Sequence, residues 1–508
     1  MIMGLIILVV GLIGQWLLGL FVAAIVLDDR FSGSRQHKLE TGSLKQSRQS
    51  NMTIGISSSM AELAGLGCVF GVGITTWCLF LWSCFGGMLG ILPSGLLAAI
   101  GLVTGGPLFI SRLRQHWRQH SPRSLIASTE RQERSACLCC QVAISMIFIA
   151  ALFQTLQTPQ KLWDERAIFA LKGVVLFEGR SIHSPSLLHA DFVQYHPRYP
   201  LLLPLAEQNI YALLGRVDDR LSKIVFTMLY CGLVLTTAGV LQRHLSRGQA
   251  WMGGLLLATV PVLMPYEYGF LCGQADAPVA CFHGLSVLYL WEGLTRERNG
   301  QSSRRSMLMA GICGGLAAFT KDEGTAFLMI DASILGLFWL ASIRNPGQFH
   351  RSSFGVGIFV AAASTILLPW FIHRRSLPIT TEMNYFGRMS VELFVSRLDT
   401  LRWSVPHVVG RMFREWREWG LQWWLMLGAM ISCPRRSFQK PQLLCVLDVV
   451  GSLAALIVAG MLAPAQLDEH IGGSSHRFLM QIAPVAVLFT VTVFFGQDEN
   501  LTHSREIE

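Results

Sequence analysis

Two adjacent carboxylates follow an apolar run closely, in the segment Trp163-Asp164-Glu165-Arg166. The run before them, Cys137–Leu156, is long enough to cross a bilayer as a helix. A carboxylate placed just outside a membrane could act as a general base on a substrate at the membrane surface. The structural alternative is that Asp164 and Glu165 only begin a surface helix, where acidic side chains favour the helix dipole. The spacing alone leaves both interpretations open.

Two further polar motifs lie at the ends of apolar runs. His196, Arg198 and Tyr199 stand among prolines in His196-Pro-Arg-Tyr-Pro200, which favours a fixed backbone shape but not a particular chemistry. Asp276 opens an apolar run within Gly273-Gln-Ala-Asp-Ala-Pro278. An ionisable residue in a membrane span is costly and therefore suggests a function, although a helix N-cap explains Asp276 equally well.

Cationic residues complete the set of candidates. Lys321 and Glu323 lie in a short turn between two apolar runs, and Arg477 stands at the entry of the last run. A lysine at this depth suits a lipid phosphate, but it could also extend to the headgroups with Glu323 as its ion partner. Arg477 is unfavourable at a helix N-terminus, which indicates an anionic partner.

Composition indicates which class of protein positions these residues. Of the 508 residues, 52% are hydrophobic and only 14% are charged, whereas soluble domains carry about 25% charged residues. Repeated apolar runs of about 20 residues predict an all-α integral membrane protein with about 13 transmembrane helices. The net charge of +9 comes mostly from loop arginines, so it indicates contact with membrane lipid and not with nucleic acid.

The loop charges predict an orientation for the chain. The short loops Arg243–Arg247, Arg296–Arg305, Arg344–Arg351 and Arg435–Lys440 are basic and fall on one side if the spans alternate. The positive-inside rule makes that side cytoplasmic. Four polar features then face outward, and the topology permits them to meet: Asp164/Glu165, Asp276, Lys321/Glu323 and His476-Arg477. The segment His407–Gly420 alternates aromatic and charged residues, which is typical of a helix lying on the membrane surface.

The motifs in this order resemble those of the GT-C superfamily of polytopic glycosyltransferases. The similarity is to the group that includes dolichyl-phosphate-mannose-protein mannosyltransferases and lipid A aminoarabinose transferases. It rests on Asp164-Glu165 after a span, His196–Pro204, Gly273–Pro278, Thr320-Lys-Asp-Glu-Gly324, and Arg477 with Pro484 beyond it. The resemblance divides the chain into an N-terminal membrane extension of about three spans (1–135), a GT-C-like membrane domain with outer-face interfacial helices (136–496) and a cytoplasmic tail (497–508).

The resemblance also implies a reaction and a location. The expected enzyme is a membrane glycosyltransferase that moves a hexose or pentose from a polyprenyl-phosphate donor to a hydroxyl of a glycan, lipid or protein acceptor, with inversion. The active site would lie on the outer (periplasmic or luminal) face of the cell membrane. Asp164 would be the general base with Glu165 beside it, and the substrate-binding candidates are His196, Arg198, Tyr199, Asp276, Lys321, Glu323 and Arg477. A divalent cation is compatible with these carboxylates, but the sequence does not indicate a metal.

Two other functions remain open from the residues. One is a non-catalytic membrane scaffold, which would not need the order of motifs on the outer face. A multi-pass transporter or lipid flippase would also be rich in apolar spans, but such proteins often contain internal repeats with broken helices in matching halves. No such repeat is evident in the chain, and the acidic pair Asp164-Glu165 lies outside the apolar runs. The cysteines lie largely within apolar runs, without the spacing of a zinc site.

Overall fold

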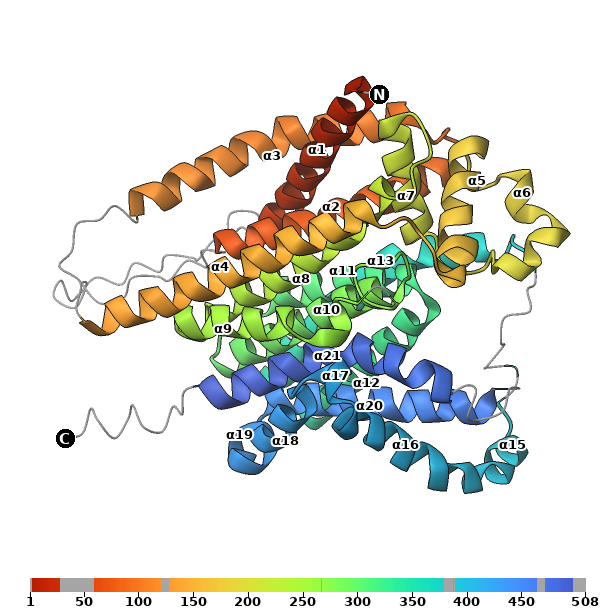
Figure 1. Cartoon of the computed structure of the whole chain (residues 1–508). Helices are drawn as coiled ribbons and strands as arrows, with labels where there is room; N and C mark the ends of the chain where they lie inside the picture. Colours follow the sequence, from red (N-terminus) through yellow and green to blue (C-terminus); the bar gives the residue numbers. More distant parts are fainter. Residues whose placement is uncertain are drawn as a thin grey trace.

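The computed structural model describes residues 2–27, 59–119, 128–265, 267–344, 346–378, 387, 389–463 and 471–496. The regular structure in these ranges is helical, and no strand occurs within them. Figure 1 shows that most of the long helices share one general direction. In the described ranges, nine helices are long and apolar enough to cross a membrane. The chain is therefore an all-α, multi-pass membrane protein, and this part of the prediction is confirmed.

The nine candidate membrane helices match apolar runs that the sequence shows. They are α1 (Ile2–Leu27), α2 (Met60–Cys84), α3 (Ile91–Gln119), α4 (Ser128–Gln157), α8 (Ile224–Leu241), α12 (Asp322–Ala341), α13 (Pro346–Arg374), α20 (Lys440–Leu462) and α21 (Gly473–Phe495). Helix α3 begins at Ile91 because a turn precedes it, in which Gly86 and Gly90 take φ values of 82° and 152°. These values lie in the left-handed region that glycine tolerates best.

Shorter elements connect and fill the bundle. They are η2 (Asp164–Ala170), α5 (Leu171–Gly179), α6 (Pro185–Leu188), η3 (Ala190–Tyr195), α7 (Leu202–Leu214), η4 (Leu221–Lys223), α9 (Arg247–Ala258), η5 (Pro261–Leu263), α10 (Asp276–Arg298), α11 (Arg304–Thr320), α15 (Val391–Ser396), η6 (Leu398–Thr400), α16 (Leu401–Arg414), α17 (Trp416–Trp419), α18 (Gln422–Ser432) and α19 (Pro434–Ser437). At 12 and 11 residues, α9 and α18 are too short to span a bilayer alone. The predicted number of about 13 spans therefore remains a prediction.

Helix α10 forms the centre of the bundle. Every residue from Asp276 to Leu294 is buried, and α10 packs against α8, α11, α20 and α21. A helix that is buried on all sides needs polar side chains to be satisfied by its neighbours. Polar residues on α10 are therefore expected to have partners on the surrounding helices.

The N-terminal helices are joined to this bundle. Helices α1, α2 and α3 pack against one another, and α2 also packs against α8 and α7. All residues of α7 are buried, although this helix is too short to span a membrane. The domain boundary expected at residues 135/136 remains a prediction, and the expected tail at 497–508 lies outside the described residues.

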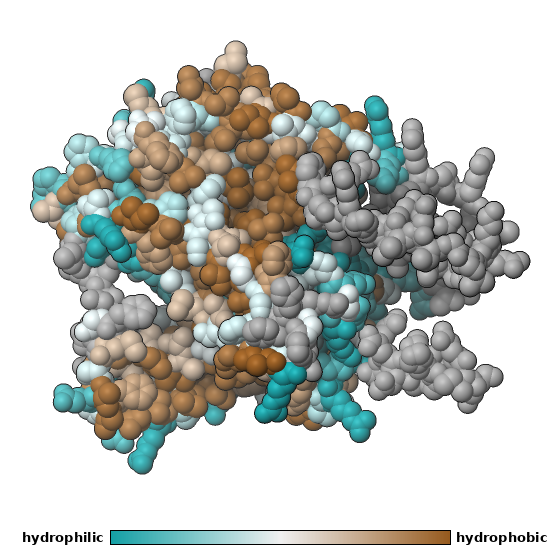
Figure 2. Space-filling view, turned by 180° about the vertical axis from the view of Figure 1, so that it is seen from behind, coloured by the Kyte–Doolittle hydropathy of each residue, from teal (hydrophilic) through white to brown (hydrophobic). Residues whose placement is uncertain are grey.

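The two ends of the bundle differ in their polar contacts. At one end, Arg243 from the α8–α9 connection pairs with Glu62 of α2 and Glu292 of α10. Arg298 donates to Gln439 at the same end. The basic loops lie at this end as well. The opposite end carries η2, the start of α10, the α11–α12 turn and the start of α21. Apolar side chains cover much of the face between the ends that Figure 2 shows, as contact with lipid requires.

Candidate active site

Asp276 is the centre of an ionic cluster at the end of the bundle opposite Arg243. It is the first residue of α10 and is fully buried. Its Oδ2 accepts hydrogen bonds from Arg477 Nη2 at 2.7 Å and Nε at 3.1 Å. Its Oδ1 accepts from Lys321 Nζ at 3.0 Å and from Gln481 Nε2 at 2.8 Å. Both oxygens of the carboxylate are thus occupied, and Asp276 fixes two cations from different elements.

Arg477 connects this buried centre to Asp164. Its Nη1 donates to Asp164 Oδ2 at 3.1 Å, and its guanidinium lies 5.4 Å from the ring centre of Tyr268. The Asp164 side chain is 30% exposed, whereas that of Asp276 is 1% exposed. Asp164 is therefore far more accessible than Asp276 to a substrate in water or at the headgroups, as is Glu323, whose side chain is 35% exposed.

Lys321 is held in the turn between α11 and α12. Its ammonium contacts Glu323 at 2.7 Å as well as Asp276. Burial alone would lower the pKa of Lys321, but Asp276 and Glu323 raise it above its ordinary value. A β-carbon added at Gly324 would lie 2.0 Å from the Ala317 carbonyl oxygen. Only glycine therefore lets α12 begin directly after Lys321.

Glu165 lies next to Asp164 in sequence but in a different environment. Its carboxylate is fully buried and accepts backbone N–H bonds from Lys161 at 2.9 Å, Leu162 at 3.1 Å and Gly273 at 2.8 Å. A β-carbon at Gly273 would lie 2.7 Å from Glu165 Cγ. The glycine of the Gly273–Pro278 motif is thus required by the close approach of Glu165. Glu165 joins η2 to the segment that leads into Asp276.

His196 and Tyr199 form a second group on the segment before α7. Their rings stack at 5.1 Å, and Lys172 of α5 lies 5.6 Å from the Tyr199 ring. Lys172 Nζ also donates to the His196 carbonyl at 2.7 Å. His196 has a φ of 53°, which is unusual for a residue other than glycine. Lys172 thus links this group to α5. Arg198 belongs to the same segment, and its buried Nε has no hydrogen-bond partner among the described residues.

The structure adds residues that the sequence interpretation did not select. Gln481 lies one turn after Arg477 on α21 and also reaches Asp276. Tyr268 packs against Arg477 and against His476, whose ring centre is 4.5 Å away. Arg411 of α16 lies 3.3 Å from His476 Nδ1. Gln481 is a polar residue in an apolar run and lies four positions after Arg477, on the same helix face. This spacing is the sequence signal that could have identified it.

The arrangement combines a reachable carboxylate with fixed cations. Asp164 can accept a proton, and Arg477 and Lys321 can attract an anionic group at the membrane surface. Because both Asp276 oxygens accept hydrogen bonds from cations or an amide, a metal ion there would compete with Arg477 and Lys321. The group of His, Asp and Glu side chains in the described residues that could hold a metal ion lies elsewhere, at His283, Asp331 and Asp448.

Comparisons with known proteins show similarity at the level of structure only. No protein-family model matches the chain, and no curated protein matches it. Among solved structures, the fold is similar to that of ArnT from Cupriavidus metallidurans, whose crystal structure is of the apo state. The identity is 15% and the TM-score is 0.46, and the match covers 72% of this chain and 61% of the ArnT chain. A similarity at this level does not assign an activity, so the function must be inferred from the residues of the chain itself.

Proposed function

We propose that the chain is a GT-C-type membrane glycosyltransferase that uses a polyprenyl-phosphate sugar on the outer face of the membrane. The supporting observation is the ionic cluster in which Arg477 bridges the buried Asp276 and the partly exposed Asp164. Asp164 is the general base of this proposal. Arg477 and Lys321 are the groups that receive the phosphate, and Asp276 positions both of them.

The proposed reaction balances with these residues alone. Asp164 takes the proton of an acceptor hydroxyl while the hydroxyl oxygen attacks the anomeric carbon of the sugar. The bond from that carbon to the phosphate oxygen breaks, and polyprenyl phosphate leaves with the electron pair. Attack from the face opposite the leaving group inverts the configuration. Phosphate is a good leaving group when fixed cations stabilise its charge, so no separate general acid is required.

The environments of the two aspartates support this division of roles. A base must be reachable, and 30% of the Asp164 side chain is exposed. Arg477 Nη1, 3.1 Å away, donates to Asp164 Oδ2 and so orients this carboxylate. Asp276 is enclosed and saturated with donors. Its role in the proposal is to hold Arg477 and Lys321 in a fixed arrangement, so that little reorganisation is needed when the phosphate arrives.

A site that faces outward would favour a lipid-linked donor. If the basic loops near Arg243 and Arg298 face the cytoplasm, the Asp276 cluster faces outward, away from the compartment where nucleotide sugars are made. A polyprenyl phosphate carries the sugar across the bilayer and keeps its phosphate at headgroup level, next to Lys321 and Arg477.

The test is sugar transfer by the purified protein in proteoliposomes. Polyprenyl-phosphate hexoses and pentoses are supplied with extracted membrane glycolipid as acceptor, and the release of polyprenyl phosphate is measured. At least one lipid-linked donor should be consumed, whereas the corresponding UDP- and GDP-sugars should not. Transfer from a nucleotide sugar in the absence of a lipid carrier would refute the proposal.

The competing proposal is a transporter or lipid flippase. The buried ionisable group formed by His283, Asp331 and Asp448 favours it, because such residues within membrane spans often mark ion or substrate pathways. The same proteoliposomes discriminate the two functions. A transporter would move labelled polyprenyl-phosphate sugar across the bilayer without releasing polyprenyl phosphate. A glycosyltransferase would release it only when the acceptor is present on the same side as Asp164.

A further inference from the structure

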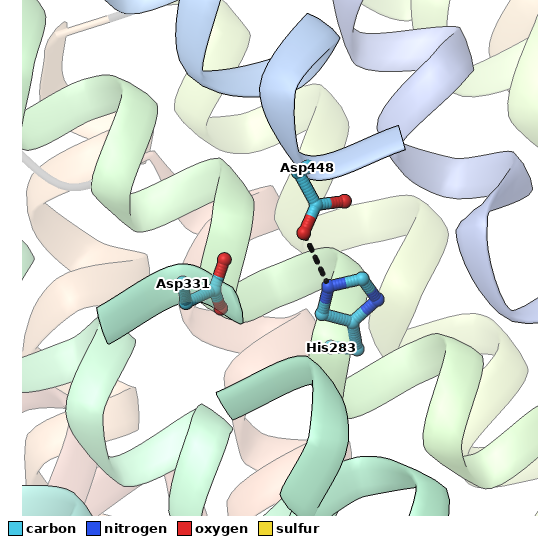
Figure 3. Close-up of side chains that lie close together, drawn as sticks. All are labelled: His283, Asp331 and Asp448. Carbon is cyan, nitrogen blue, oxygen red and sulfur yellow. Dashed lines mark hydrogen bonds and ion pairs between the residues drawn. The ribbon is translucent and has the colours of Figure 1, made fainter. Parts of the chain in front are cut away.

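Three ionisable side chains meet inside the bundle, separate from the candidate active site. Figure 3 shows His283 of α10, Asp331 of α12 and Asp448 of α20 pointing toward one another. His283 is 1% exposed and both aspartates are 0% exposed. His283 lies seven residues after Asp276, about 10 Å deeper along a helix that rises 1.5 Å per residue. The group, named here the inner trio, thus lies at bilayer depth on three different helices.

The geometry of the inner trio fits one ion. One ligand atom from each residue can be chosen so that all three lie within 4.8 Å of one another. His283 Nε2 is 3.2 Å from Asp448 Oδ1. Asp331 Oδ1 and Asp448 Oδ2 are buried, and neither has a hydrogen-bond partner among the described residues. Two buried carboxylate oxygens therefore have lone pairs free for a ligand next to an imidazole nitrogen.

The surroundings of His283 fix the orientation of its ring. Nδ1 lies 3.3 Å from the carbonyl oxygen of Gln481 and can donate its hydrogen there. The Phe327 ring stacks on the imidazole at 4.2 Å with an angle of 10° between the planes. A histidine that donates Nδ1–H to a backbone carbonyl presents the lone pair of Nε2, and this is the usual outer contact of a metal-bound histidine.

The charges also favour a cation. Two ionised carboxylates enclosed by helices at bilayer depth are costly unless a cation or a bound proton compensates their charge. One protonated imidazole compensates a single carboxylate. A divalent ion compensates both and leaves His283 neutral. When Nε2 carries no proton, Nε2 and Asp448 Oδ1 are two acceptors that face and repel each other. A metal ion bound to both atoms removes this repulsion.

We propose that the inner trio binds one divalent transition-metal ion, of the zinc class, through His283 Nε2 and one oxygen each of Asp331 and Asp448. Imidazole with carboxylates is a ligand set that suits Zn²⁺ and related ions. Ser286 Oγ donates to Asp331 Oδ2 at 3.1 Å and so orients this carboxylate. The ion joins α10, α12 and α20.

The inner trio is also connected to the candidate active site through Gln481. The carbonyl oxygen of Gln481 contacts His283, and its side-chain amide donates to Asp276. The metal site therefore fixes the part of α21 that presents Arg477. This inference does not depend on the proposed glycosyl transfer, since it concerns the metal content of the folded protein and not its reaction.

The test is the metal content of the full-length protein, purified in detergent from zinc-supplemented cells after washing with chelator. Elemental analysis should find about one zinc ion per chain. Protein produced with Co²⁺ in place of zinc should show the visible absorption of cobalt bound by nitrogen and oxygen in a low-coordinate site. Both signals should fall about tenfold or more in His283→Gln and Asp448→Asn.

Matched controls use exposed residues of the same types. His189→Gln and Asp191→Asn change side chains that are 67% and 91% exposed, and both variants should retain the metal and the cobalt spectrum. If the first two variants fail to fold, Asp331→His keeps three ligands and should still hold one ion. Wild-type protein that contains no divalent metal and gives no cobalt spectrum would overturn the proposal, as would metal that persists in His283→Gln. The inner trio would then be a proton-binding group.

Discussion

Asp164, Glu165 and Asp276 are carboxylates at the same end of the bundle, and their surroundings separate them. Glu165 accepts three backbone N–H bonds in a fully buried position. Asp276 accepts from two cations and an amide. Asp164 has one cation, Arg477, and remains partly exposed. Solvent exposure of the side chain, and not residue type, thus distinguishes the candidate base Asp164 from the two positioning carboxylates.

The substitution Asp164→Asn tests this assignment. Asparagine keeps the shape and can still contact Arg477, but it cannot accept a proton, so turnover should fall by about 10²–10⁴-fold. The thermal unfolding midpoint should change little, because the side chain lies at the edge of the cluster. The measurement is the rate of polyprenyl-phosphate release, with Asp191→Asn as the matched control for a surface aspartate on the same segment between α4 and α8. Turnover close to that of the wild type would remove Asp164 as the base.

The sequence could identify the residues of the Asp276 cluster but not their bonds. Asp164, Asp276, Lys321 and Arg477 could be selected because each is ionisable and stands at the end of an apolar run. Their hydrogen-bond partners depend on how α10, α12 and α21 pack, and no local pattern encodes that packing. The inner trio was missed for the same reason: His283, Asp331 and Asp448 each appear as a single polar residue inside an apolar run.

At the scale of elements, the apolar runs predict the long helices well. Eight of the nine candidate membrane helices contain predicted runs almost unchanged, since length and apolarity are local properties. The exception is α3: the apolar run there predicts a span over Phe85–Ile110, but Gly86 and Gly90 form a turn and the helix begins at Ile91. Helix α7 was not predicted, because its 13 residues are too few to span and it is buried by tertiary packing alone.

The contact between α2 and α10 gives a prediction for an element. Glu62 of α2 is fully buried and accepts from Tyr289 at 2.9 Å, and Arg243 pairs with both Glu62 and Glu292. Arg243→Met keeps much of the side-chain volume but leaves two buried carboxylates without this cation. Loss of one partner from a buried ionic group costs roughly 3–5 kcal/mol. The thermal unfolding midpoint in detergent should therefore fall clearly.

The control for Arg243→Met is Arg216→Met. Arg216 pairs with Asp218 at 3.0 Å, but its side chain is 54% exposed, and exposed ion pairs contribute about 0–1 kcal/mol. The two variants remove the same charge from different depths. Equal midpoints for both would show that the Glu62–Arg243–Glu292 network does not hold α2 against the bundle.

At the scale of the whole molecule, the charges of the loops and the polar contacts divide the bundle into two ends. The basic connections come together near Arg243 and Arg298, and the Asp276 cluster lies at the other end. Sequence could predict this division because the side on which a loop emerges depends on the alternation of spans. The predicted side of each loop does not change when a helix boundary is misplaced by a few residues. Which end faces the cytoplasm rests on the positive-inside rule.

Cysteine labelling in intact cells tests that orientation. In a background without reactive cysteines, Lys161→Cys places a thiol at an exposed position before η2, and Gln301→Cys places one in the exposed connection between α10 and α11. If the basic end is cytoplasmic, a membrane-impermeant maleimide should label residue 161 in intact cells and residue 301 only after permeabilisation. The reversed pattern would put Asp164 and Arg477 in the cytoplasm. A nucleotide sugar would then be accessible to the site, and the reason for expecting a lipid-linked donor would be lost.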